Sequence, residues 1–419
     1  FFIFLFKTSS LSTSKLYFDV NLAPAEEGRS NVRLPDDDLP NLDEGTRYTF
    51  LSLPLLFDQA STLTFAFRKR AGDGGSPGAA DLSKISYPNL RGKESSIEKM
   101  LQASFTDAFL VVKNGALVFE EYFNGMSPSS FHLLNSVSKS FLGVLIGILS
   151  HEDILRPEDS VTKHLPELQD TAFRETSIQQ ALDMTGAVKY DENYKNPAAD
   201  FWKETAVVGW RPDLAENVPQ KTLFEFALSL AESEQDNGAK FDYRTVFTNV
   251  LAMTAESATG VNLQNLLEEK LWQKLGTEQD AAIVVDNSGF PYMGAGMNAC
   301  ARDLARFGQM IAQGGLFNGE QIIPSAWIKD LLEGNQTLRS LFEMSDYGVM
   351  RPGGHYHNQF WVSAPEDQTL MCIGIHGQFI HINISNQTVI VKLSSQPEPA
   401  STDSFLEAGL AFDALSHQI

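Results

Sequence analysis

The sequence predicts an α/β sandwich that is completed by both ends of the chain and carries an inserted, mainly helical domain. Three observations indicate this fold class: a strand–turn–strand pattern at residues 108–123, helical patterns through most of residues 177–296, and alternating strands that end in a helix at residues 359–415. Because a strand with one apolar face has to bury that face, we expect helices to cover the sheet. A cleft is expected between the two parts.

Length and composition agree with a globular protein. The chain has 419 residues, of which 43% are hydrophobic and 11% aromatic, enough for one large domain or two interleaved domains with a real core. Residues 62–67 alternate in a way that is typical of a strand. The predicted units are a lead-in at residues 1–95 with a Gly-rich linker at 71–80, an α/β domain at 96–176 and 297–419, and a helical domain at 177–296.

The first α/β segment opens with a short helix and a hairpin. Residues 96–103 have a helical pattern, and residues 108–112 and 116–123 alternate as strands. Asn114 and Gly115 stand between the two strands. Since an Asn-Gly pair supplies the positive φ angles that tight hairpins need, the sequence predicts a β-hairpin here.

The remaining elements follow from the spacing of apolar residues. The predicted helices of the helical domain start at residue 177 and span residues 222–234, 245–259 and 262–275. Two further helices are predicted at residues 301–313 and 324–332. The chain closes with four strands and a helix, at residues 359–363, 370–374, 379–383, 389–394 and 402–415.

Charge and metal-ligand counts narrow the function classes. The 32 Lys and Arg against 53 Asp and Glu give a net charge of −21, which disfavours nucleic acid and anionic membranes as partners and is consistent with a simple role in solubility. With only Cys300 and Cys372, the sequence holds no disulfide framework and no cysteine-based metal cluster. The eight histidines are scattered, so we expect neither a catalytic metal nor another cofactor.

The first six residues are all apolar, and the sequence does not begin with Met. Six residues are too few to span a bilayer. The stretch is either the remnant of a signal-peptide core or the edge of a fragment, and the sequence leaves both open. We expect a cytoplasmic protein, monomeric or homodimeric, without a membrane partner.

One stretch combines an apolar helix with two reactive side chains. Ser136 and Lys139 stand three residues apart at its start, and the residues that follow, through Leu149, are nearly all apolar. Such positions share a helix face, and the free N–H groups at a helix start favour a developing oxyanion. A partly desolvated lysine has a lowered pKa and can take a proton from serine. The alternative is an ordinary helix start, with Ser136 as N-cap and Lys139 in solvent.

Three motifs resemble those of the serine β-lactamase and penicillin-binding-protein superfamily. They are Ser136-x-x-Lys139, Phe241-x-Tyr243 and Ile373-Gly374-Ile375-His376-Gly377-Gln378. Within this superfamily, residues 107–415 are similar to the 6-aminohexanoate-dimer hydrolase family, including the stretch Tyr190-Asp191-Glu192-Asn193-Tyr194. The resemblance implies a β-lactamase-like sandwich, with an antiparallel sheet flanked by helices. It also implies a serine hydrolase that cleaves small carboxylic esters or linear amides through an acyl-enzyme.

The resemblance further implies roles for single residues. Ser136 is expected to be the acylated nucleophile, Lys139 its general base, and Tyr243 the phenol that passes a proton to the leaving group. The backbone N–H groups of Ser136 and Ile375 are expected to form the oxyanion hole. Substrate contacts are expected from Tyr194 on a mobile loop, Trp210, Trp361 and His376.

Each of these side chains also has a structural interpretation. Tyr243 can be a packed aromatic, and Tyr194 can belong to an ordinary surface loop. Trp210 and Trp361 are residue types that are often found in cores. His376 is expected to bond locally and, at most, to position the strand. The catalytic interpretation of Tyr243 relies on the neighbouring lysine, which would lower the pKa of the phenol enough for proton transfer.

The sequence departs from the β-lactamase pattern at two motifs. Residues 243–245 are Tyr-Arg-Thr without the usual final asparagine, and residues 376–378 are His-Gly-Gln in place of Lys-Thr-Gly. The groups that would bind a β-lactam carboxylate are therefore missing, and penicillin turnover is not expected. The acidic residue on which the family's amide activity depends falls on Thr205 by an ungapped count.

A catalytically silent protein of the same fold, which binds a ligand or a partner in the cleft, is the alternative from another function class. Such a protein has no need of a nucleophile, a base and a proton relay together. The presence of Ser136, Lys139 and Tyr243 in one chain therefore favours the hydrolase.

Overall fold

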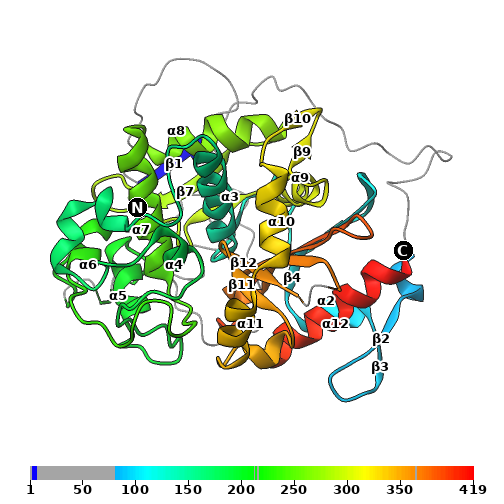
Figure 1. Ribbon diagram of the computed structural model, residues 1–419. Coiled ribbons are helices and arrows are strands. Elements are labelled where there is room, and N and C mark those ends of the chain that lie inside the picture. Colours follow the sequence, from blue (N-terminus) through cyan, green and yellow to red (C-terminus); the bar gives the residue numbers. More distant parts are fainter. Residues whose placement is uncertain (1, 7–80, 212, 215–216, 364–365) are drawn as a thin grey trace, which may run out of the picture.

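The computed structural model describes residues 2–6, 81–211, 213–214, 217–363 and 366–419 (Figure 1). Most of the predicted lead-in, including the strand expected at residues 62–67 and the Gly-rich linker, lies outside the described residues. The described segments form a sheet with helices on both faces and a helical region beside it (Figure 1).

The largest sheet has seven antiparallel strands in the order β11-β12-β13-β14-β15-β4-β5. Their bounds are β4 Thr106–Lys113, β5 Ala116–Tyr122, β11 His355–His357, β12 Phe360–Val362, β13 Thr369–Gly374, β14 Gln378–Asn383 and β15 Thr388–Ser394. β4 pairs with β15, with Val111 opposite Ile390. The sheet is thus completed by two distant parts of the chain, and the predicted fold class is confirmed.

The hairpin between β4 and β5 forms where the Asn-Gly pair predicts it. Asn114 has φ 51° and Gly115 has φ 75°, the left-handed values that a two-residue hairpin turn requires. Along β4, Leu110 and Val112 face one core, while Phe109 and Val111 face another. This period of two explains why the strand could be recognised from its sequence.

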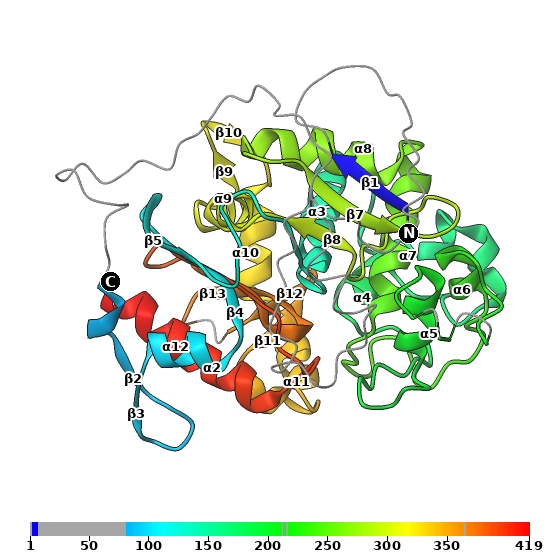
Figure 2. The same cartoon turned by 180° about the vertical axis from the view of Figure 1, so that it is seen from behind.

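Helices cover both faces of the large sheet, as Figure 2 shows. One face carries α2 (Ile97–Ala103) and α12 (Thr402–Gln418), where Phe412 stacks on Phe109 of β4. The other face carries α3 (Val137–His151) and α9 (Ala301–Ala312). Helix α9 approaches β14 and β15 closely because it has Gly308 at the contact, where a Cβ would lie 2.5 Å from Val389.

The helical region packs beside this sandwich and is coloured green in Figure 1. Its helices are α4 Ile178–Leu182, α5 Asp200–Val207, α6 Leu223–Leu228, α7 Thr245–Thr259 and α8 Leu263–Leu267, followed by the π-helix η4 Glu268–Trp272 and the 3₁₀ turn η5 Gln273–Leu275. The helix predicted at residues 222–234 is wrong in its second half. There the backbone leaves the helix because Leu230 accepts a hydrogen bond from Ala172, and Glu232 accepts one from Lys189.

A second, four-stranded sheet lies where the sequence suggested helices and loops. It has the order β1-β7-β8-β6, with β1 Phe2–Phe6, β6 His132–Leu133, β7 Ala281–Val285 and β8 Met297–Ala299. Short β6 leads directly into α3 and pairs with β8. This pairing fixes the start of α3 against the rest of the molecule.

The smaller elements complete the list of bounds. They are η1 Leu82–Lys84, β2 Ser86–Pro88, β3 Glu94–Ser96, η2 Val161–Lys163, η3 Pro166–Asp170, β9 Leu316–Phe317, β10 Glu320–Gln321, α10 Ser325–Glu333, α11 Gln336–Glu343, η6 Gly348–Met350 and η7 Ile375–Gly377. The boundaries of the predicted domains stay a prediction.

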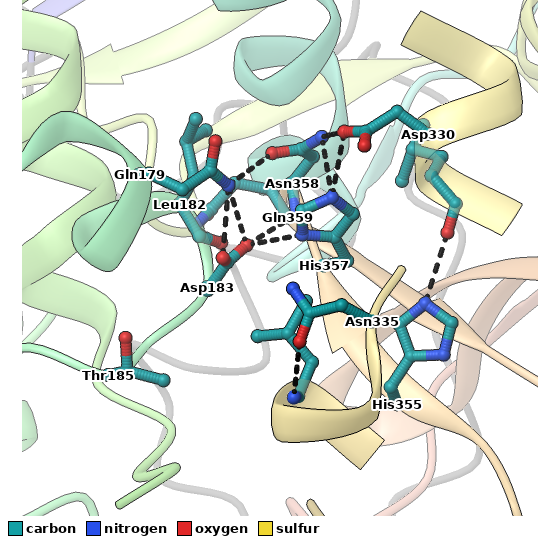
Figure 3. A network of polar contacts seen from close by, with 12 residues as sticks. Gln179, Leu182, Asp183, Thr185, Asp330, Asn335, His355, His357, Asn358 and Gln359 are labelled. Atoms are coloured by element: carbon teal, nitrogen blue, oxygen red, sulfur yellow. Dashed lines mark hydrogen bonds and ion pairs between the residues drawn. The ribbon is translucent and has the colours of Figure 1, made fainter. Parts of the chain in front are cut away.

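The β11–β12 turn ties three helices to the sheet (Figure 3). Gln359 in this turn accepts a hydrogen bond from Ser140 of α3 through its carbonyl and one from Thr248 of α7 through its side chain. Its side-chain amide donates to the carbonyl of Leu182 in α4. The turn therefore fixes how α3, α4 and α7 sit on one another.

His357 precedes this turn and is held between two carboxylates (Figure 3). Its Nδ1 lies 2.7 Å from Asp183 Oδ1 and its Nε2 lies 2.9 Å from Asp330 Oδ2. Burial on its own lowers the pKa of His357, but the charges and hydrogen bonds of the two carboxylates outweigh it and raise this pKa to about 9. The imidazolium thus joins α4 to β11 and α10.

We expect stability to depend on pH through His357. Because its folded pKa is raised above the ordinary 6.5, the stabilisation is complete below that value and is lost as pH rises through about 9. A shift of this size corresponds to up to about 3 kcal/mol in the free energy of unfolding. Denaturant unfolding near pH 6 and near pH 10 of the wild type and of His357→Gln measures it. The same pH slope in both proteins would contradict the assignment.

Candidate active site

Ser136 stands at the start of α3, in the N-cap position, with its side chain making no capping hydrogen bond. Lys139 is one turn further on and is 1% exposed. Every residue of α3 from Val137 to Leu149 is buried. The alternative of an ordinary helix start, with a capping serine and a solvated lysine, is therefore wrong.

The amine of Lys139 has three polar neighbours within hydrogen-bond distance. Its Nζ lies 2.9 Å from Ser136 Oγ, 3.0 Å from Thr245 Oγ1 and 2.6 Å from the Gly294 carbonyl. Burial lowers the pKa of Lys139 to about 8, although the negative charges of Glu192 and Glu204 raise it in part. A substantial fraction of this amine is therefore neutral near pH 8, as a proton acceptor must be.

Tyr243 lies two residues before α7 and closes the site beside Lys139. The ring centroid is 5.1 Å from Lys139 Nζ, and the side chain is almost fully buried. Burial and the charge of Glu192 raise the pKa of Tyr243 well above its usual value, while hydrogen bonding to Ser136 lowers it in part. The expectation of a lowered phenol pKa is therefore wrong, because burial and the charge of Glu192 outweigh the hydrogen bond to Ser136. The phenol stays protonated and is a proton donor.

The end of β13 brings Ile375 to the turn that carries Ser136. Asn135 donates a side-chain hydrogen bond to the Ile375 carbonyl, at 3.1 Å. The contact is tight because Gly374 has no Cβ, which would lie 2.4 Å from the Leu134 carbonyl. The backbone groups of Ser136 and Ile375 that the sequence assigned to an oxyanion hole thus come from neighbouring segments.

His376 has a left-handed backbone, φ 62°, and a buried ring. Its Nδ1 lies 2.6 Å from the Gln396 carbonyl, and burial lowers the pKa of the ring to about 4. This bond agrees with the local positioning that we expected of His376. A substrate contact through its ring stays a prediction.

Aromatic residues surround Tyr243 on the side of the large sheet. Trp361 of β12 stacks on Tyr243 with ring centroids 5.3 Å apart, and Tyr347 and Tyr356 contact both rings. Trp210 instead contacts Tyr292 edge-on, at 5.4 Å. The structure therefore brings Trp361 into contact with a predicted catalytic residue and places Trp210 in another cluster.

The Tyr194 hydroxyl donates a hydrogen bond to Glu192 at 2.9 Å. Its ring packs edge-on against Phe201 and Trp202. Glu192 is partly buried and also accepts hydrogen bonds from the N–H and the hydroxyl of Thr245. Sequence reasoning missed Glu192, although it lies two residues before Tyr194 in a stretch already singled out.

A second carboxylate, Glu204 of α5, is also buried close to this site. It accepts hydrogen bonds from Tyr190 and Asn249, and burial raises its pKa to about 8. Thr205, where the ungapped count expected an acid, is buried, and its hydroxyl donates to the Trp202 carbonyl. The expected position therefore holds no acid, and the neighbouring Glu204 is hydrogen-bonded within the protein.

The cation nearest Tyr243 in sequence points away from the site. The Arg244 guanidinium bonds to Glu234 and Asp242 and to the Val188 carbonyl.

Within the described part of the chain, His, Cys, Asp and Glu side chains form no group of three that would hold a metal ion. Among the same residues, no helix combines the length and apolar character needed to cross a membrane.

The sequence from residue 94 to residue 412 matches a family model described as Beta-lactamase. The chain belongs to the beta-lactamase family. Across 306 residues it is 36% identical to the 6-aminohexanoate-dimer hydrolase of Paenarthrobacter ureafaciens, a match that covers 72% of this chain and 76% of that protein. The predicted family is therefore confirmed, and so is the enzyme class, a hydrolase related to β-lactamases.

Solved structures share the fold of this family member. A Bacillus anthracis structure described as a candidate 6-aminohexanoate-dimer hydrolase has a TM-score of 0.70 and 29% identity, over 81% of this chain and 86% of that one. A D-stereospecific amidohydrolase from Streptomyces sp. has a TM-score of 0.56 and 16% identity, over 73% and 96% of the two chains. The second likeness shows the fold alone.

Proposed function

We propose that this beta-lactamase family member hydrolyses small carboxylic esters and linear amides through an acyl-enzyme on Ser136. The observation that carries the proposal is the contact of Ser136 Oγ with a buried lysine amine whose pKa is about 8. A serine hydroxyl is a weak nucleophile until a neighbouring base accepts its proton. Lys139 supplies that base from within the same helix turn.

Acylation follows from the positions of these groups. Neutral Lys139 takes the Ser136 proton as Oγ bonds to the substrate carbonyl carbon. The carbonyl oxygen becomes negatively charged and accepts hydrogen bonds from the backbone N–H groups of Ser136 and Ile375. As the bond to the leaving group breaks, Tyr243 gives that group a proton, and the Lys139 ammonium restores the phenol. Water then attacks the acyl carbon while Lys139 accepts its proton, and Lys139 returns this proton to Ser136 Oγ as the bond from Oγ to the acyl carbon breaks.

Neither Lys139 nor Arg244, the cations of the first two motifs, is placed to bind a β-lactam carboxylate. A bound carboxylate needs a cation, but Arg244 is engaged with Glu234 and Asp242, and Lys139 is engaged with Ser136. The aromatic wall of Trp361 and Tyr347 suits apolar chains instead. The relative from Paenarthrobacter ureafaciens, a 6-aminohexanoate-dimer hydrolase by name, supports a linear amide among the substrates, and β-lactams such as nitrocefin are expected to be poor.

The exchange of Tyr243 for Phe tests this assignment. An amine leaving group must collect a proton as it departs, whereas p-nitrophenolate leaves without one, so the loss should be larger for an amide. We expect about 10²- to 10⁴-fold on the 6-aminohexanoate dimer and a smaller factor on p-nitrophenyl butyrate. Values of kcat/KM for both substrates and for nitrocefin, on wild type and variant, decide it. Equal losses would mean that Tyr243 mainly activates Ser136, and nitrocefin as the best substrate would overturn the substrate class.

A further inference from the structure

Glu192 is a partly buried carboxylate for which the mechanism above has no role. Three donors converge on it: the Thr245 N–H at 2.6 Å, the Thr245 hydroxyl at 2.5 Å and the Tyr194 hydroxyl at 2.9 Å. Burial raises the pKa of Glu192, while the charge of Lys139 and the hydrogen bonds from Thr245 and Tyr194 lower it in part and stabilise the ionised form. Removing a charge from water is unfavourable unless partners stabilise it. The role of Glu192 is therefore sought in its hydrogen-bond partners, Thr245 and Tyr194.

Thr245 stands between Glu192 and the amine of Lys139. A hydroxyl carries a single proton, and here that proton goes to the Glu192 carboxylate, so the Thr245 oxygen can only accept a hydrogen bond from Lys139. The Gly294 carbonyl also accepts only. Two N–H bonds of the amine therefore have fixed directions.

Those two directions determine the third. In the neutral amine, the position left over is the lone pair, and the remaining neighbour of Nζ is Ser136 Oγ at 2.9 Å. The lone pair is consequently directed at the proton it has to remove. If Thr245 were free to rotate, its hydroxyl could donate to the lone pair and block it.

We propose that Glu192 is a positioning residue that acts through the Thr245 hydroxyl to direct the lone pair of Lys139 at Ser136. The inference rests on the proposed function, since it concerns the same base. Glu192 does not need to touch the substrate for this role. This positioning role explains why the Glu192 carboxylate accepts hydrogen bonds both from Tyr194 and from Thr245 at the start of α7.

The charge of Glu192 has a second effect, opposite in sign. Lys139 Nζ lies 5.1 Å from the ring centroid of Tyr243, and the charges of Glu192, on the segment before α5, and of Glu204 on α5 act on it. Of the two carboxylates, Glu192 raises the pKa of Lys139 more than Glu204 does. Removal of its charge should therefore lower the pKa of the base, while loss of the hydrogen bond lowers the rate.

The test is the pH profile of kcat/KM for p-nitrophenyl butyrate, from about pH 6 to about pH 10, in four variants. Glu192→Gln should lower the plateau by about 10- to 100-fold and move the acidic limb to lower pH. Thr245→Val should lower the plateau similarly, whereas Thr245→Ser, which keeps the hydroxyl, should restore most of it. Because both residues act along one path, the Glu192→Gln/Thr245→Val double variant should be about as slow as the slower single variant.

Three results would overturn the inference: a Glu192→Gln plateau within about twofold of wild type, a limb that does not move to lower pH, or multiplicative losses in the double variant. A variant that merely misfolds would lose active sites without moving the limb, so titration with a fluorophosphonate counts the active sites of each protein. The proposed function fails separately, when the wild type itself neither turns over the ester nor takes up the fluorophosphonate.

Discussion

Replacement of Ser136 by Ala should reduce ester and amide hydrolysis to background, a loss of about 10⁴-fold or more in kcat/KM. The variant lacks the oxygen that forms the acyl bond, and water has no comparable position against Lys139. Initial rates with p-nitrophenyl butyrate and with the 6-aminohexanoate dimer measure the loss.

Two serines on the same helix provide matched controls. Ser138 donates to the Asn135 carbonyl and Ser140 donates to the Gln359 carbonyl, so neither hydroxyl points at Lys139. Alanine at either position should leave the chemistry in place, with a change in stability only. Loss of turnover in Ser138→Ala or Ser140→Ala, together with retention in Ser136→Ala, would show that the motif is assigned in the wrong register.

The second large effect is expected at Lys139. Wild-type kcat/KM should rise with pH through an apparent pKa of about 8, because the base must be neutral and burial already lowers its pKa to that value. Lys139→Arg should lose about 10³-fold or more, since a guanidinium stays protonated across this range and cannot act as a base. A pH–rate profile of both proteins from about pH 6 to about pH 10 measures this.

Lys139→Met serves as the control for bulk, because it removes the amine without adding a larger cation to the buried site. Both variants should be similarly slow. Activity that persists in Lys139→Arg with an unchanged profile would remove Lys139 from the role of base.

Local periodicity made the large sheet and most helices predictable. The strands of β13, β14 and β15 and the helix α7 begin within one residue of their expected positions, because apolar alternation and helical spacing are properties of contiguous sequence. The sequence did not predict strand β11, because two of its three residues are histidines and give no pattern of apolar residues. Its His355 and His357 are buried only because Leu331, Asp183 and Asp330 bind them from other segments.

The residues of the candidate site also fall into those that contiguous sequence predicts and those that come together only on folding. The spacing of Ser136 and Lys139 on one helix predicts their contact, and the resemblance to a known family supplied Tyr243 and Ile375. Glu192 could not be found this way, because its contact with Thr245 spans 53 residues and exists only after folding. The pKa of Tyr243 was predicted with the wrong sign for a related reason. Burial by residues distant in sequence, which a local pattern does not reveal, is the largest cause and raises this pKa.

The central claim is that Ser136 forms the covalent intermediate, and one measurement tests it most directly. The wild type is treated with a fluorophosphonate, its intact mass is measured, and the modified peptide is sequenced by fragmentation. We expect a single adduct on Ser136, loss of ester turnover in proportion to labelling, and no adduct in Ser136→Ala. An adduct on Ser138 or Ser140, or full ester turnover by protein that carries no adduct after exhaustive treatment, would contradict it.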